Sequence, residues 1–398
     1  MAEEKKEIDY TLANPDTLTK YKTAAEISNT VLSAIVGLVK EGATVLSLCE
    51  EGDKLLEEET SKVFKGKKDI KKGVSFPTTI SPDEIITPLT PNPEDTTTPE
   101  WALKAGQVVK IQLGAHIDGF AAVVGSTVVV PASEGAEAEI TGEVADLLLA
   151  THYINQAFLR LILPPSLHPG AEEGKVVKPP TQTKINSILS SIAKTYGCSL
   201  VENTTTYQFE RNEIEGKKKI ILAPSEGTKG EGHPEIGDVW GVEVAVALGD
   251  SGKLKPSEYK PTLHRNTGVT FHLTRDTSRK VFNEVRTKFG SFPFSSRHLS
   301  DQKAAKFGIL EATRHNVLRQ YEILVEKEGK MTSKDFSVVA ITKKGLSIIS
   351  APPAIDLEKI KSDKKITDEE ILKLLEMPIG APKKANKKKK KAGASADE

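Results

Sequence analysis

The apolar positions of the chain repeat first with a helical period and later with a strand period. The first helical stripe follows an N-terminus of mixed charge, and Asp16 is predicted to cap it. A second, acidic helix is predicted from roughly Ser47 to Phe64. The stripe of the first helix consists of Ala24, Ile27, Val31, Ile35 and Leu38.

Two β-rich runs between residues 108 and 130 flank the dipeptide Asp118-Gly119, which favours the mirror-image turn of a tight hairpin. This turn would set Gln112 opposite Gly125 and make Val123 a diagonal neighbour of Gln112 on the same face. The preceding segment, Thr78 to Pro99, is rich in Pro and Thr, which predicts an irregular surface loop.

The rest of the chain mixes helices and strands, which indicates an α/β (α+β) protein. Helical periodicity covers residues 139–162 and 181–195, and strand-like alternation covers Val239 to Leu248. A helical insert is predicted at about 255–328, with a helix from Thr277 to Phe289. The expected later elements are strands near Asp335 to Thr342 and Leu346 to Ser350, then a short helix through Leu375 with a Thr367–Glu370 capping box.

Composition narrows the functional classes. The 398 residues include 55 Lys+Arg and 55 Asp+Glu, so no global basic excess indicates nucleic acid or membrane binding. Cys49 and Cys198 lie outside any CxxC pattern, which argues against a zinc knuckle or a disulfide framework and fits a reducing compartment. The sequence shows neither a secretory signal nor an apolar run long enough for a membrane span, so no membrane partner is expected.

Positive charge is concentrated locally, in three places. Such clusters are typical of phosphate binding, but a solvated helix end or a solubilising tail would have the same composition. For the tail, residues 379–398, a nuclear or nucleolar address is a further reading, and its low complexity predicts disorder. The candidate nucleic-acid contacts are Lys65, Lys67, Lys68, Lys71 and Lys72; Arg275, Arg279, Lys280, Lys288 and Arg297 in the insert; and Lys387, Lys388, Lys389, Lys390 and Lys391 in the tail.

Common catalytic motifs are missing from the sequence: there is no Walker A loop, HExxH or GxSxG. Four segments instead resemble type II methionine aminopeptidases over most of residues 15–350: SFPTTIS (75–81), the hairpin, VWGVEVAV (239–246) and TKYKTAAEISNTVLSAI near the N-terminus. VLSLCEEGD (45–53), the GAHIDGF turn and the Lys-rich end make the resemblance to the proliferation-associated, curved-DNA-binding branch closer still.

The resemblance implies a pita-bread fold over residues 14–378, after a flexible segment 1–13, with the type II insert at about 255–328. In the active peptidases five side chains hold two metal ions that activate a water. The matching positions here carry Gln112, Val123, Tyr207, Glu243 and Asp335, with Pro88 at one substrate-histidine position and Glu215 near another. Two carboxylates and an imidazole are therefore replaced, which predicts a non-catalytic protein without metal or cofactor.

Glu243 is expected to persist as a polar group hydrogen-bonded to Gln112 or Tyr207. The resemblance further implies binding to the large ribosomal subunit and its rRNA near the nascent-chain exit, a monomer, proximity to other proteins at the exit, and residence in the cytoplasm and nucleus, including the nucleolus. Structured RNA and curved DNA are further candidate partners. Two alternatives stay open: a DNA-binding transcriptional or chromatin-associated factor that recognises curved DNA, and, least favoured, an active aminopeptidase.

Overall fold

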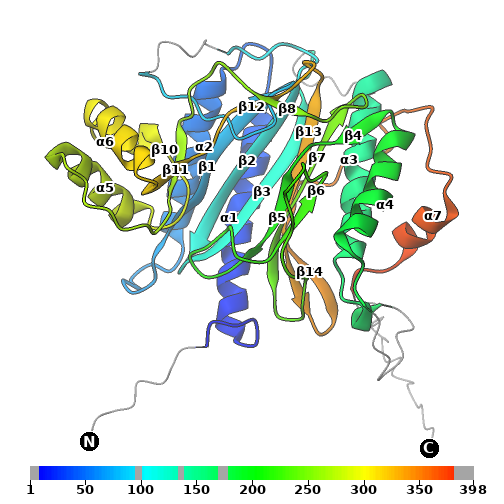
Figure 1. Cartoon of the computed structure of the whole chain (residues 1–398), viewed down its shortest axis with the longest axis horizontal. Coiled ribbons are helices and arrows are strands. Elements are labelled where there is room, and N and C mark those ends of the chain that lie inside the picture. The colour runs from blue at the N-terminus through cyan, green and yellow to red at the C-terminus, as the bar shows by residue number, and fades with distance from the viewer. Residues whose placement is uncertain (1–8, 95–100, 133–138, 169–177, 381–398) are drawn as a thin grey trace, which may run out of the picture.

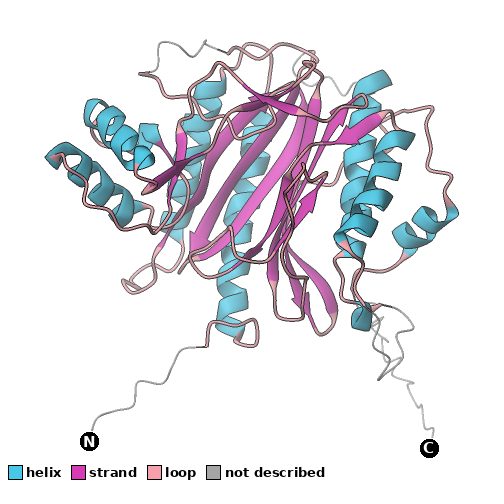
Figure 2. Ribbon diagram, viewed as in Figure 1, coloured by secondary structure: helices cyan, strands magenta, loops and turns pink. Residues whose placement is uncertain are grey.

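A nine-stranded sheet forms the centre of the protein in the computed structural model, which describes residues 9–94, 101–132, 139–168 and 178–380 (Figures 1 and 2). Its strand order is β1-β2-β3-β13-β7-β5-β6, with β14 beside β13 and β4 beside β7. The strands are β1 Lys72–Pro82, β2 Val108–Ile117, β3 Phe120–Val129, β4 Cys198–Leu200, β5 Thr204–Phe209, β6 Lys219–Leu222, β7 Val239–Leu248, β13 Thr332–Thr342 and β14 Gly345–Ser350.

Two pairs of helices cover this sheet, one for each half (Figure 1). Helices α1 Pro15–Leu38 and α2 Val45–Lys62 pack on β1, β2 and β3. Helices α3 Gly142–Leu161 and α4 Gln182–Thr195 pack on β4, β6, β7 and β13, and α7 Glu369–Glu376 packs on α3. Fully buried side chains such as Leu32 and Trp240 fill the two resulting cores, and their burial is the main stabilising contribution.

The predicted hairpin is confirmed as β2 and β3. Asp118 and Gly119 both have positive φ, 55° and 83°, as the mirror-image turn requires. Gln112 lies opposite Gly125, as predicted, and Val123 lies opposite Gly114. The Asp118 carboxylate accepts hydrogen bonds from Lys20 and Arg211, each at 2.8 Å, so the turn is tied to α1 and to the loop after β5.

The insert is helical, as predicted, and it has a small core of its own. Helix α5 Asp276–Lys288 contains the predicted apolar face, and it packs against α6 Gln302–Arg314, a helix that sequence periodicity did not reveal. A three-stranded sheet of β9 Leu263–Asn266, β10 Phe294–Ser295 and β11 Leu318–Gln320 supports the helices, and β8 Leu254–Pro256 pairs with β12 Leu324–Glu326 beside the main sheet.

Two predicted helix caps were wrong by one or two positions. The side chain of Asn14, not that of Asp16, accepts the first free amide of α1, and Pro15 opens the helix. Asp368, not Thr367, caps α7, because its carboxylate accepts the amides of Glu370 and Ile371. In both cases a neighbouring Asx residue supplied an equally suitable side-chain oxygen.

The prediction of an irregular surface loop from Thr78 to Pro99 was also wrong, because its first part is a strand and Ile85, Ile86 and Leu89 beyond the strand are buried. Residues Thr78 to Pro82 belong to β1 and are buried, with Thr79 opposite Gln112. Pairing is irregular between Phe76 and Thr79, where Pro77 lies, and such a bulge accommodates a proline without ending the strand. Near the C-terminus, Ile379 and Gly380 pair with Gly345 and Leu346 at the start of β14. The lysines of the predicted tail lie outside the described residues.

Candidate functional site: a degenerate cavity and a basic end

A cavity of about 480 Å³ opens on the face of the sheet opposite the helices. Four of the five positions that match metal ligands line it, namely Gln112, Val123, Tyr207 and Glu243. Pro88 and Glu215, at the two substrate-histidine positions, also line it. The sequence comparison therefore located the cavity correctly.

Three residues that line the cavity, Gln112, Phe336 and Glu243, belong to one register row across adjacent strands, in which Gly125 lies between Gln112 and Phe336. Directly paired residues point to the same face, so Phe336 stands between the two polar side chains. Gly241 leaves room for two rings, because a Cβ there would lie 2.2 Å from Phe209 and 2.9 Å from Phe336. An aromatic ring thus fills space between the two remaining polar groups.

Asp335, the fifth predicted position, does not face the cavity. Along β13 the neighbours Lys334 and Phe336 line the cavity, so the intervening Asp335 points toward α3, where it contacts Asn155. Burial raises the pKa of the Asp335 carboxyl to about 6, although the hydrogen bond from Asn155 acts in the opposite direction. The alignment at this strand was off by one residue, which moves a side chain to the other face.

Lys334 is one of the polar residues of the cavity that sequence reasoning missed, together with Glu202, Lys255 and Arg319. Its Nζ lies 3.5 Å from Oε1 of Glu243, and its side chain is 5% exposed. The structure therefore gives Glu243 an ammonium partner in place of the predicted Gln112 or Tyr207. A lysine next to the remaining carboxylate supplies a fixed positive charge where a metal ion would otherwise be needed to neutralise it.

A second buried lysine, Lys110, lies two residues from Gln112 along β2, and Lys110 and Lys334 flank Thr127 on adjacent strands. Its Nζ donates to the carbonyl oxygen of Asp83 at 2.5 Å. Burial lowers the pKa of Lys110 to about 7, against the opposing effect of Asp83 and Glu84. Of these two lysines, Lys334 lines the cavity, and its positive charge disfavours the approach of a further positive ion.

The side chains at the cavity do not fit the two-metal centre that the resemblance implies. Among residues 9–94, 101–132, 139–168 and 178–380, no group of three or more His, Cys, Asp or Glu side chains is arranged to hold a metal ion. Glu215 is engaged elsewhere, because it pairs with Arg265 and Arg319 and accepts from the Tyr321 hydroxyl at 2.7 Å. Glu243 is thus the one predicted ligand that keeps a carboxylate at the cavity.

The predicted lysine cluster forms the loop between α2 and β1, and four of its five members are exposed: Lys65, Lys67, Lys68 and Lys71. Lys72 differs, because its ammonium donates to the carbonyl oxygens of Ser61 and Val63 at the end of α2. It therefore caps the helix and neutralises the C-terminal end of its dipole. Lys72 is consequently a poor candidate for phosphate contact.

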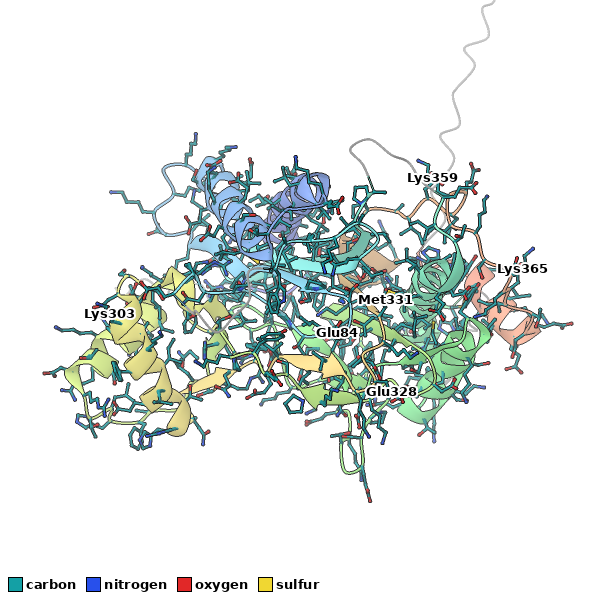
Figure 3. The ribbon with its side chains drawn as sticks, turned by 90° about the horizontal axis from the view of Figure 1, so that it is seen from above. Glu84, Lys303, Glu328, Met331, Lys359 and Lys365 are labelled. Carbon is teal, nitrogen blue, oxygen red and sulfur yellow. The ribbon has the colours of Figure 1, made fainter. Side chains whose placement is uncertain are left out.

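The insert lies at the same end of the molecule as the α2–β1 loop in both views (Figures 1 and 3), and it carries further exposed cations. Arg275 and Lys280 were predicted, whereas Arg286, Lys303 and Lys306 were missed, the last two because α6 was not recognised. We call the exposed set the basic end: Lys65, Lys67, Lys68, Lys71, Arg275, Lys280, Arg286, Lys303 and Lys306. Figure 3 shows Lys303 projecting outward from this end.

Three predicted contacts in the insert are already paired. Arg279 donates to the backbone of Leu273 and Thr274 and pairs with Asp276, and Lys288 lies 2.6 Å from Glu284. The side chains of Arg279 and Lys288 remain partly exposed despite these contacts. The prediction for Arg297 is wrong, because its side chain is 5% exposed and forms a buried ion pair with Asp53 of α2.

Arg297 instead helps to anchor the insert to the body. One Asp53 oxygen accepts from Arg297 and from Nε2 of His298 at 2.7 Å, and the other accepts the amide of Thr78 at 2.7 Å. Burial alone would raise the pKa of Asp53, but Arg297 and His298 together lower it below its usual value. The carboxylate is therefore a charged link between α2, β1 and the insert.

The fold and this cavity together define a protein with a metallopeptidase framework whose predicted metal positions lack most of their donors. The sequence pattern of metallopeptidase family M24 matches residues 19–164. The Schizosaccharomyces pombe "Curved DNA-binding protein" is 41% identical and covers 98% of this chain and 97% of its own length. The chain therefore belongs to the curved DNA-binding protein family, a branch of the M24 fold.

Solved structures agree with this assignment. A thermophilic Arx1 is 49% identical, with a TM-score of 0.89 over 92% of this chain and 99% of its own. The methionine aminopeptidase of Thermotoga maritima has a TM-score of 0.51 at 13% identity, over 85% of this chain and 97% of its own, which supports the pita-bread fold alone. The predicted fold and family are confirmed. In the described part of the chain, the helices are too short or too polar for a membrane span.

Proposed function

We propose that this protein is a non-catalytic binding protein whose basic end binds the rRNA of the large ribosomal subunit, near the nascent-chain exit. The observation that carries the proposal is the gathering of exposed lysines and arginines from the α2–β1 loop and the insert at one end of the molecule (Figure 3). Exposed cations bind phosphates by releasing counterions, and they need no recognition helix to do so. Arginines such as Arg275 add planar contacts suited to structured RNA.

The cavity supports the non-catalytic part of the proposal. A two-metal hydrolase needs several carboxylate and imidazole donors around a water. Here Gln112, Val123 and Tyr207 take three of these positions, and Phe336 stands in the register row between Gln112 and Glu243. The remaining carboxylate, Glu243, is paired with Lys334.

The family resemblance implies further properties besides rRNA binding. We propose that the protein acts as a monomer in ribosome biogenesis or translation, close to other proteins at the exit, in the cytoplasm and the nucleus, including the nucleolus. The lysine-rich residues 387–391 would add phosphate contacts or a nucleolar address.

A second candidate function is binding to curved DNA, and the name of the relative from Schizosaccharomyces pombe favours it. Bent duplexes are recognised by shape and backbone charge, which a basic surface without a recognition helix can supply. The basic end alone does not distinguish a DNA backbone from an RNA backbone, so the two functions predict different outcomes in a direct competition.

Competition at physiological salt separates these functions. The protein is bound to a labelled large-subunit rRNA fragment, and unlabelled fragment or bent duplex DNA of equal length is added while anisotropy is followed. Ribosomal RNA binding predicts that the DNA competes at least about tenfold less well, a difference of about 1.4 kcal/mol. Stronger competition by the DNA would favour the second function, and release of N-terminal methionine from a test peptide by metal-loaded protein would contradict the non-catalytic part.

A further inference from the structure

A second cavity, which we call the insert cavity, is lined by helix α6, by strands β9 and β11, and by the segment just before β9. Its volume is about 520 Å³, which is within the range of small-molecule sites. His264 of β9 and Gln320 of β11 both line it, and they lie directly opposite each other, so they belong to one face of the small sheet. The insert cavity shares no lining residue with the cavity at the degenerate metal positions.

Helix α6 contributes one continuous stripe of side chains to the insert cavity. Its lining residues fall at i, i+3, i+4, i+7, i+8, i+11 and i+12 from Gln302, which is one face of a helix. Helix α5 packs on a different face, at Gly308, where an added Cβ would lie 2.8 Å from Val281. Within the stripe Ile309 is half-buried and Leu310 is 51% exposed. The insert cavity therefore contains apolar surface that the described part of the chain leaves open to solvent.

Three basic side chains and no carboxylate line the insert cavity, and the three are Lys260, Lys306 and Arg314. All three are exposed, and none of them forms an ion pair or a side-chain hydrogen bond with another described residue. Lys288, elsewhere in the insert, is by contrast paired with Glu284. Unpaired like charges around one concavity attract an anion from solution.

The neutral polar groups of the insert cavity leave this positive charge largely uncompensated. Gln320 donates to the exposed carboxylate of Glu322, the one acidic group within the described ranges that is hydrogen-bonded to a lining side chain. Nδ1 of His264 lies 3.2 Å from the carbonyl oxygen of Thr262, and burial lowers the pKa of His264 to about 4, so its ring is neutral at pH 7. The charge around the insert cavity is therefore positive.

We propose that the insert cavity is a binding site for a small organic anion with an apolar body, such as an aromatic carboxylate. The unpaired cations attract the anionic group, and the apolar body packs on Ile309 and Leu310, which lie between Lys306 and Arg314 along α6. A nucleic-acid backbone would use the cations but leave the apolar stripe uncovered, so a small anion fits better. The site goes beyond the proposed function, because Lys260 and Arg314 are not part of the basic end.

A matched pair of ligands tests the need for both charge and an apolar body. 2-Naphthoate and 2-naphthamide share one ring system, but only the first carries a negative charge at neutral pH. Calorimetric titration of the full chain is expected to show 2-naphthoate binding at least about tenfold more tightly than 2-naphthamide, and inorganic phosphate at equal concentration is expected not to displace it. Absence of 2-naphthoate binding, equal binding of the amide, or displacement by phosphate would overturn the proposal, the last by indicating a bare phosphate site.

Two substitutions with matched controls locate the site. Leu310→Ser and Arg314→Gln are each expected to weaken 2-naphthoate binding about fivefold, because they remove apolar contact and positive charge respectively. Phe307→Ser on α6 and Arg286→Gln on α5 are the controls, since both side chains are exposed but neither lines the insert cavity, and they leave the affinity unchanged. Thermal melting verifies that each variant is folded. Wild-type affinity in folded Leu310→Ser or Arg314→Gln, or an equal loss in the controls, would refute the assignment.

Discussion

Lys334 at the cavity and its neighbour Lys110 differ from the lysines of the basic end in their exposure to solvent. Lys334 and Lys110 are buried, one 3.5 Å from a carboxylate and the other bound to a backbone carbonyl. Lys65, Lys67, Lys68 and Lys71 are exposed. A buried charge that is already paired interacts mainly with groups of the protein itself, whereas an exposed cation is available to bind a polyanion.

This difference indicates where binding to a large partner can occur. In the cavity, the four lining positions that matched metal ligands carry neutral or paired groups, namely Gln112, Val123, Tyr207 and the Glu243–Lys334 pair. At the basic end, the α2–β1 loop and the insert supply positive charge from segments far apart in sequence (Figure 3). The ion pair of Asp53 with Arg297 holds these two segments together. Its removal is predicted to have the largest effect on the free energy of unfolding.

Asp53→Ala is expected to destabilise the protein by about 3–5 kcal/mol, because it leaves the buried guanidinium of Arg297 without its carboxylate. The unfolding free energy from urea titration measures the effect. Asp16→Ala provides a matched control, because its ion pair with Lys20 is largely exposed on the Asp16 side and contributes about 1 kcal/mol or less. Equal losses in the two variants would show that the anchor is no stronger than a surface pair.

Asp335→Asn is expected to stabilise the protein at pH 7 by about 1–2 kcal/mol. The folded-state pKa of about 6 lies above the ordinary value of 3.8, so the folded state binds the proton more tightly, and wild-type stability falls as pH rises from about 4 to about 6. The partial exposure of Asp335 keeps the effect below the full value of that shift. Denaturation at several pH values checks it, and a variant with the wild-type pH slope would place the titrating group elsewhere.

Lys67→Ala tests how much one exposed lysine of the α2–β1 loop contributes to rRNA binding. Loss of one phosphate contact is expected to weaken rRNA binding severalfold and to reduce the slope of log affinity against log salt by about one. A salt series of anisotropy titrations gives both quantities. An unchanged slope would remove the α2–β1 loop from the interface, even if other parts of the basic end still bind.

Lys72→Met changes the first residue of β1, directly after this loop, and is the matched contrast to Lys67→Ala. It is expected to have the smallest effect of these substitutions on rRNA binding. Its ammonium donates to carbonyl oxygens at the end of α2, so the substitution is expected to cost about 0.5–1.5 kcal/mol of stability. The salt slope of rRNA binding should stay within error of the wild type. A fall in slope equal to that of Lys67→Ala would show that Lys72 releases its backbone contacts to bind phosphate.

Sequence patterns predicted the elements whose signals are local. Asp118 and Gly119 specify the hairpin through turn geometry, and the hairpin then fixes the positions of Gln112 and Val123. The resemblance to the peptidases located the cavity. Helix α6 was missed although Ala305, Gly308 and Ala312 form its buried face, because residues this small give a weak apolar stripe.

The failures involve register and long-range pairing. Assignment of Asp335 rather than Lys334 or Phe336 to the cavity is a one-residue slip, which in a strand reverses the face. Arg297 appeared to be a surface cation because its partner, Asp53, lies 244 residues away. Such partners become visible only when the fold brings the segments together.

Co-sedimentation with purified large ribosomal subunits in low salt tests the central claim most directly. Three variants are compared with the wild type: charge reversal of Lys65, Lys67, Lys68 and Lys71 to Glu; the same reversal of four exposed lysines elsewhere, Lys194, Lys361, Lys365 and Lys373; and Gln112→Leu in the cavity. Binding through the basic end requires the first variant to remain in the supernatant, whereas the other two variants are expected to sediment like the wild type. Wild-type sedimentation of the first variant, or loss of binding by Gln112→Leu, would contradict it.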